Sequence, residues 1–381
     1  MAEPTAQPIK QSRRSEVIVA LTILIGTIGI LSAVEILLRA QTAAQFGNTE
    51  GAFEQSPLYA VDQKTGLRRL NPGARSGKIS VNREGFRGPE IAAQSAGNIV
   101  QIAFVGHSTT LDPYSGETQN WPFLVSRAIG SDIPDCRVEL INGGVPGYGT
   151  SSMLRYFDAY VRSHKPVFTF LLTADYNTNF NRQAKAQGVS TSADVRHSWL
   201  AANSLLFAKI EKNSRAVMFM RSAYSEVGKL HPDWESAERE FRGTMTEAIE
   251  HIASSGSQVA VLTSAHRLRA DQTPQEQISA VQSALEFSPY FSIPEMIEAH
   301  ARFNRVIEGA AHSSNAILIA DENSIPGTPA YWVDSSHFSA TGSRLMAARV
   351  MRQLHSSQQY RDLIERLVRG CRAIGAKTKG N

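Results

Sequence analysis

A run of strand-forming residues at 99–105 ends at Gly106, and this feature constrains the fold more than any other in the chain. The run reads IVQIAFV, the composition of a strand that is buried on both faces in a parallel sheet. Gly106 permits a tight turn into a helix, and Ser108 lies in that turn. Because ligands bind at the carboxyl ends of strands in open parallel sheets, we expect Ser108 to lie at a functional site.

Four later apolar runs repeat this pattern of a strand, a polar loop and a helix. They lie at residues 137–141, 166–173, 258–264 and 316–320. The alternation predicts an α/β fold with a five-stranded parallel sheet. Residues 180–255 separate the third run from the fourth, and their helical pattern predicts an insertion that caps the site.

Residues 17–39 predict one transmembrane helix, because the stretch from 17 to 34 carries no charge and about 20 apolar residues cross a bilayer. The tail at 1–16 is basic, which predicts a cytoplasmic amino terminus and export of the rest of the chain. We therefore expect a single-pass protein of the bacterial inner membrane with a periplasmic domain. A cleaved signal peptide is the alternative, but the apolar stretch is longer than such peptides usually have.

Two segments flank the main domain, which we expect at 98–357. Residues 40–97 are rich in Gly, Asn, Pro and Arg and predict an extended juxtamembrane arm. Arg83 and Arg87 in this arm could face an anionic ligand, and we interpret them instead as salt-bridge partners. Residues 358–381 predict a basic terminal helix that lies in solvent, with contact to an anionic membrane surface as the alternative.

Composition excludes several function classes. The net charge is +4, but 39 basic and 35 acidic residues are interspersed, which gives no support for a nucleic-acid partner. Cys136 and Cys371 lack the CxxC spacing of a metal knuckle or a redox motif, so we expect no metal and no cofactor. We interpret the two cysteines as unpaired buried thiols, while a disulfide stays open for an exported domain.

Three residues predict nucleophilic catalysis by a serine. Ser108 would attack the substrate, His337 would accept its proton, and Asp334 would hold the other ring nitrogen of the histidine. The DxxH spacing, just before a predicted helix, allows both side chains to face the site from one turn. As donors to the oxyanion we expect the backbone N–H of Ser108, the backbone N–H of Gly144 and the side-chain amide of Asn177.

Four segments in this order resemble the four sequence blocks of the SGNH/GDSL hydrolase superfamily: VGHSTT, NGGVPGYGTSS, ADYNTN and DSSHFSATG. The resemblance covers residues 98–354, and the segments NREGFRGPE and EILLR are similar to the exported, membrane-anchored branch of that family. It implies a flavodoxin-like three-layer sandwich with strand order 2-1-3-4-5. Ser108 would then lie at the point where the strand order reverses.

Two positions depart from the family pattern. His107 stands where the family usually has Asp before the serine, and residues 175–178 read Asp-Tyr-Asn-Thr in place of Gly-x-Asn-Asp. Neither departure removes one of the three catalytic residues, but both bear on the geometry of the oxyanion hole. We expect the His107 ring to turn away from Ser108 and to bond to backbone groups.

The sequence therefore predicts an exported, membrane-anchored serine hydrolase that cleaves an ester through an acyl-enzyme on Ser108. From location and family, we expect a small acyl group on an envelope or extracellular glycan, or on a lipid. Two alternatives stay open. One is an O-acyltransferase in which a sugar hydroxyl replaces water, and the other is an inactive glycan-binding scaffold in polysaccharide export.

Overall fold

The computed structural model describes residues 13–46, 58–92, 98–173, 176–189, 191, 198–221, 223–225 and 229–378. Contacts divide the chain into two compact units, one of residues 1–49 and 196–214 and one of residues 50–195 and 215–381. In chain order the helices and strands are α1 (Arg13–Phe46), β1 (Tyr59–Val61), β2 (Arg68–Leu70), β3 (Arg75–Ser76), β4 (Ile79–Ser80), β5 (Ile99–Gly106), α2 (Ser108–Leu111), α3 (Trp121–Asp132), β6 (Arg137–Gly144), α4 (Thr150–Tyr156), β7 (Phe168–Leu172), α5 (Tyr176–Ala186), α6 (Trp199–Asn203), α7 (Leu205–Arg221), α8 (Trp234–Ser254), β8 (Gln258–Leu262), α9 (Pro274–Val281), α10 (Ala284–Phe287), α11 (Ile293–Ser313), β9 (Ile317–Ile319), α12 (Ala340–Ser356) and α13 (Gln358–Thr378).

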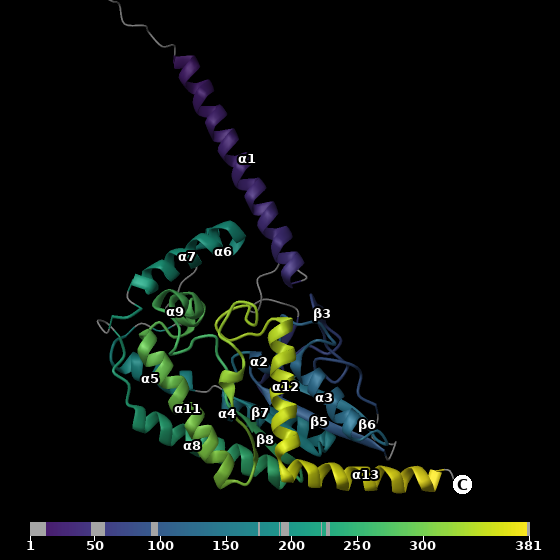
Figure 1. Cartoon of the computed structure of the whole chain (residues 1–381). Coiled ribbons are helices and arrows are strands. Elements are labelled where there is room, and N and C mark those ends of the chain that lie inside the picture. Colours follow the sequence, from purple (N-terminus) through teal and green to yellow (C-terminus); the bar gives the residue numbers. More distant parts are fainter. Residues whose placement is uncertain are drawn as a thin grey trace, which may run out of the picture. The chain divides into compact units, whose positions relative to one another are not determined.

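The larger unit is built on a parallel sheet of five strands in the order β6-β5-β7-β8-β9. Figure 1 labels four of these strands, β5 to β8. Numbered along the chain, this order is 2-1-3-4-5, which confirms the predicted topology. Gly106 at the end of β5 lies between Gly144 of β6 and Leu172 of β7. A Cβ atom at Gly106 would lie 2.7 Å from the carbonyl oxygen of Leu172, so a larger residue would push the strands apart where the chain turns toward Ser108.

Helices cover both faces of this sheet. Ala103 and Val105 of β5 pack in one cluster with α4, α8 and α11, whereas Ile102 and Phe104 pack in a second cluster with α3, α12 and α13. The alternation arises because successive side chains of a strand point to opposite faces. The result is the predicted three-layer sandwich. The helix α8, which lies within the insertion expected at 180–255, belongs to one of these layers.

The arm before the main domain is part of the same unit. Its described residues, 58–92, form two antiparallel hairpins, β1–β2 and β3–β4. Leu58, Leu70 and Ile79 from these hairpins pack on Leu111 beside the predicted site. The described part of the arm therefore packs on the main domain.

The two arginines of the arm differ in their surroundings. Arg83 is exposed and forms an ion pair with Glu90 at 3.3 Å, as expected. Arg87 is fully buried and donates hydrogen bonds to the carbonyl oxygens of Leu111 at 2.5 Å and Ser115 at 2.6 Å. Arg87 is thus neither an anion ligand nor a surface ion-pair partner. It fixes the backbone that follows α2.

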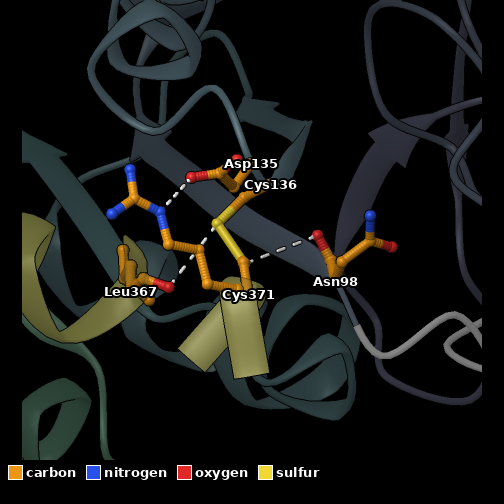
Figure 2. The surroundings of a disulfide bond; sticks show 6 residues. Asn98, Asp135, Cys136, Leu367 and Cys371 are labelled. Carbon is orange, nitrogen blue, oxygen red and sulfur yellow. Dashed lines mark hydrogen bonds and ion pairs between the residues drawn. A yellow bond between two sulfur atoms is a disulfide. The ribbon is translucent and has the colours of Figure 1, made fainter. Parts of the chain in front are cut away.

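Cys136 and Cys371 form a disulfide, with their Cα atoms 5.5 Å apart. The interpretation as unpaired thiols was wrong, because α13 folds back and brings Cys371 beside the start of β6. In Figure 2 the disulfide lies among Asn98, Asp135 and Leu367. Because 235 residues separate the two cysteines in the sequence, nothing in the sequence indicated that they lie close together.

The basic C-terminal segment is not a solvated helix. α13 buries Tyr360, Leu363 and Cys371 in the cluster that also holds α3 and α12. Arg372 forms an ion pair with Asp135 at 2.7 Å. The basic residues of α13 therefore lie on its outer face, and the helix completes one layer of the sandwich.

In the smaller unit, α1 contains the segment Ser15–Ala43, which is long and apolar enough to cross a membrane, and its most apolar 18-residue stretch has a mean hydropathy of 2.6. This segment includes the predicted span at 17–39, and a signal sequence would meet the same criteria. Glu35 of α1 accepts hydrogen bonds from the Ser204 hydroxyl and the Leu206 backbone N–H, both at 2.8 Å. Its carboxylate thus satisfies N–H groups at the start of α7 that have no partner within the helix.

Candidate active site

Ser108 is held at the junction of the central strand and a short helix. β5 ends at Gly106, His107 is the N-cap of α2, and Ser108 is the first residue of that helix. The Nδ1 atom of His107 accepts a hydrogen bond from the backbone N–H of Thr109 at 3.2 Å. The ring of His107 is thus engaged by the backbone, as the sequence predicted, and it stabilises the turn that presents Ser108.

The three predicted catalytic residues form one chain of hydrogen bonds. The Nε2 atom of His337 lies 2.7 Å from the Oγ of Ser108, and its Nδ1 lies 2.7 Å from Oδ2 of Asp334. The other carboxylate oxygen of Asp334 accepts the backbone N–H groups of Ser336 and His337, each at 2.9 Å. A single tight turn therefore fixes both the carboxylate and the imidazole that it orients.

The environment keeps Asp334 ionised. Burial acts to raise the pKa of Asp334, but hydrogen bonds from the His337 ring and from two backbone N–H groups outweigh burial and hold the pKa below its usual value. The ring edge of Tyr114 contacts His337, with 5.5 Å between ring centroids. Burial and the nearby Asp334 raise the pKa of Tyr114, which leaves it a neutral phenol. Asp334 is therefore the charged neighbour that can stabilise a protonated His337.

Gly144 does not have the role expected of it. Its backbone N–H donates to Oδ1 of Asn142 at 3.1 Å, and Gly144 does not line the cavity that holds Ser108. A Cβ atom at this position would lie 2.2 Å from the backbone nitrogen of Leu111. The prediction of Gly144 as an oxyanion donor was thus wrong, since this glycine lets β6 and α2 approach closely.

Two glycines of the loop that follows β6 line the cavity, Gly147 and Gly149, and Gly147 is the one with an unusual backbone conformation. It has a φ of +78°, a conformation that residues with a side chain rarely adopt. Among the described residues its N–H has no hydrogen-bond acceptor. The sequence marked the whole glycine-rich loop but gave no means to choose one glycine within it.

The third predicted oxyanion donor, Asn177, lies in the first turn of α5. Its side chain is outside the described residues, as are Ala174 and Asp175 just before it. The departure from the family pattern at 175–178 therefore stays an expectation about the oxyanion hole.

Ser108 and His337 open into a cavity of about 260 Å³. Three further histidines line it, and the sequence had not connected any of them with substrate binding: His107, His266 and His300. The rings of His266 and His300 stack in parallel with their centroids 3.5 Å apart. His266 follows β8 and His300 lies on α11, so no short spacing could have revealed the pair.

These three histidines are uncharged at neutral pH. Burial lowers the pKa of His107 to about 3, helped by the nearby His337, and burial with Arg269 lowers the pKa of His300 to about 3. The pKa of His266 also falls well below its usual value through burial. Within the described part of the chain, no group of three or more His, Cys, Asp or Glu residues has the arrangement of a metal site.

No protein-family model and no curated protein matches this chain. Among solved structures, the acetylxylan esterase Axe2 from Geobacillus stearothermophilus is 11% identical, with a TM-score of 0.41, and the match covers 68% of this chain and 96% of Axe2. A lipase/acylhydrolase from Enterococcus faecalis is 18% identical, with a TM-score of 0.38 and coverage of 67% and 95%. At such identities and TM-scores, the functional assignment depends on the geometry of the chain itself.

Proposed function

We propose that this protein is a serine ester hydrolase of SGNH type that acts through an acyl-enzyme on Ser108. The observation that carries the proposal is the continuous chain from Ser108 through His337 to Asp334, with 2.7 Å at both links, at the edge of a cavity. This arrangement has a nucleophile, a base and a carboxylate that orients the base.

The reaction has two halves. Ser108 Oγ bonds to the ester carbonyl carbon while its proton moves to Nε2 of His337, and Asp334 stabilises the imidazolium that results. The ester C–O bond then breaks, and the leaving alcohol takes that proton. Water attacks the acyl-enzyme by the same route, which releases a carboxylic acid and restores Ser108.

The negative oxygen that develops on the carbonyl needs preorganised donors. We assign this role to the backbone N–H groups of Ser108 and Gly147 and to the amide of Asn177. Gly147 replaces Gly144 in this assignment because it lines the cavity and its N–H has no acceptor among the described residues.

We further propose that the chain is anchored by residues 17–39 in the bacterial inner membrane, with the catalytic unit in the periplasm. The apolar stretch of α1 and the basic residues Lys10, Arg13 and Arg14 before that stretch support this topology. The Cys136–Cys371 disulfide supports export as well, because such bonds persist in oxidising compartments and are rare in the cytosol. The carrier of the ester is then an envelope or extracellular molecule, such as a glycan or a lipid.

Turnover of a simple ester tests the assignment. We expect the purified full-length protein in detergent to hydrolyse p-nitrophenyl butyrate, and the Ser108→Ala variant to lose at least ~10³-fold in kcat. An acyltransferase would form a new ester when a sugar acceptor is added, at the expense of free butyrate. Absence of turnover by the folded wild-type protein would contradict the proposal and favour the scaffold alternative.

A further inference from the structure

Apolar surface makes up the larger share of the catalytic cavity's lining. Strands, loops and the helices α9 to α12 all contribute to this lining. The apolar side chains that line it are Leu172, Ala265, Leu268, Val281, Ala284, Phe287, Met296, Phe338 and Met346. Such a surface gains free energy by taking an apolar group out of water.

The cavity also lacks charge. Its described lining contains no Lys, Arg, Asp or Glu side chain. The stacked pair of His266 and His300 contributes to the wall, and burial keeps both rings neutral at pH 7. A carboxylate or phosphate on the acyl group would thus find no ion-pair partner within this lining.

A second cavity differs from the catalytic cavity because its lining contains charged side chains. It has a volume of about 990 Å³ and shares the His266–His300 pair with the first. Its lining includes Arg267, Asp271 and Glu322, but neither Ser108 nor His337. The polar cavity is therefore the one without the nucleophile, and the group attached to Ser108 lies in the apolar one.

The volume limits the length of that group. A methylene group is about as large as a water molecule in the liquid, ~30 Å³. A cavity of about 260 Å³ thus holds roughly eight such groups. An acetyl group would leave most of it empty, whereas a chain of twelve carbons would extend out of it.

We propose that this cavity is an acyl pocket for an unbranched chain of about six to eight carbons. This inference rests on the proposed ester hydrolase activity and replaces the small acyl group that the sequence led us to expect. Each further methylene that leaves water should raise kcat/KM by roughly fourfold until the cavity is full.

A series of p-nitrophenyl esters tests the proposal with the full-length protein in detergent. We expect kcat/KM to rise from the acetate to a maximum at the hexanoate or octanoate, at least ~50-fold above the acetate, and to fall for the dodecanoate. A maximum at the acetate would overturn the acyl pocket while leaving the hydrolase in place. Failure to hydrolyse every ester would overturn the hydrolase itself, so the two failures are distinguishable.

Two variants test whether the cavity determines the preference for acyl chain length. Ala284 is partly exposed on the lining, and Ala284→Phe should lower the ratio of octanoate to acetate kcat/KM by at least ~10-fold. The matched control is Ala253→Phe, an exposed alanine outside the lining, which should keep the wild-type ratio. Phe287 is 63% exposed, so Phe287→Ala should fold and should also lower the ratio by removing apolar surface. Wild-type ratios in both lining variants would overturn the proposal.

Discussion

The histidines that line the catalytic cavity differ in the groups that surround their rings. His337 lies against the carboxylate of Asp334, which can stabilise a proton on the ring, and its other nitrogen contacts Ser108. For His107 and His266, burial is the largest influence on the pKa and keeps each ring neutral. A histidine is therefore not a base merely because it is adjacent to the nucleophile. His107 is adjacent to Ser108 in sequence, yet only the distant His337 has the partner that catalysis needs.

The largest expected effect comes from removing the paired histidine. His337→Gln should lower kcat for ester hydrolysis by about 10⁵-fold, because no base remains to take the proton of Ser108. His355→Gln is a suitable control, since His355 is exposed and lies outside the cavity. Steady-state kinetics of both variants would decide whether His107 can substitute as a base, and a loss below tenfold would break the comparison.

Asp334→Asn should have the next largest effect, about 10⁴-fold on kcat, because the amide cannot hold the required ring tautomer or stabilise the imidazolium. Thermal unfolding should show a folded protein. If the variant turned over ester at the wild-type rate, Asp334 would not be the orienting acid.

Asn177→Ala should lower kcat by about 10²- to 10³-fold with KM nearly unchanged, as for the loss of one oxyanion donor. Asn179 is a matched control on the same helix, because its amide donates to Glu240 instead. Equal kinetics for the Asn177→Ala and Asn179→Ala variants would argue against an oxyanion role for Asn177.

His107→Asn should change kcat by less than about tenfold and act mainly on acid stability, because Asn keeps an acceptor at the N-cap of α2. The pKa of His107 is about 3 in the folded protein, against an ordinary value of 6.5. The unfolded chain therefore binds more protons between these values, and the folded state loses stability as pH falls from 6.5 toward 3.

The variant lacks this contribution, so its loss of stability between pH 7 and pH 5 should be smaller by about 2 kcal/mol. Denaturant unfolding at both pH values measures the difference. An identical pH dependence in wild-type and variant would show that His107 is not held neutral by burial.

The smallest expected effect on turnover comes from the disulfide. Cys136→Ser with Cys371→Ser should lower the free energy of unfolding by about 2–5 kcal/mol while kcat stays within about twofold. Chemical denaturation and ester kinetics on the same sample test this. A large loss of kcat in a folded variant would show that the packing of α13 influences the cavity.

The strands and the triad could be predicted because each leaves a local signal. Ser108 follows a buried apolar run, and Asp334 and His337 share one turn whose spacing is visible in the sequence. The sheet order followed from the resemblance that these segments carry. Gly144 ends β6 and is followed by further glycines in the next loop, and these glycines differ only in backbone angle and surroundings, which the sequence does not show.

The remaining features depend on contacts between distant segments. The burial of Arg87, the pairing of Cys136 with Cys371, and the stacking of His266 on His300 each join elements that are separate in the chain. Arg87 resembled its exposed neighbour Arg83 in sequence, and only the fold distinguishes them. Cavity shape depends on such contacts too, so the proposed longer acyl chain could not be inferred from the sequence.

Covalent labelling tests whether Ser108 is an activated nucleophile. The folded full-length protein would be treated with a fluorophosphonate probe, and the modified residue would be identified by peptide mass spectrometry. We expect one adduct on Ser108 that is absent in Ser108→Ala and strongly slowed in His337→Gln. A folded protein without an adduct on Ser108, or with equal labelling of the His337→Gln variant, would contradict this role of Ser108.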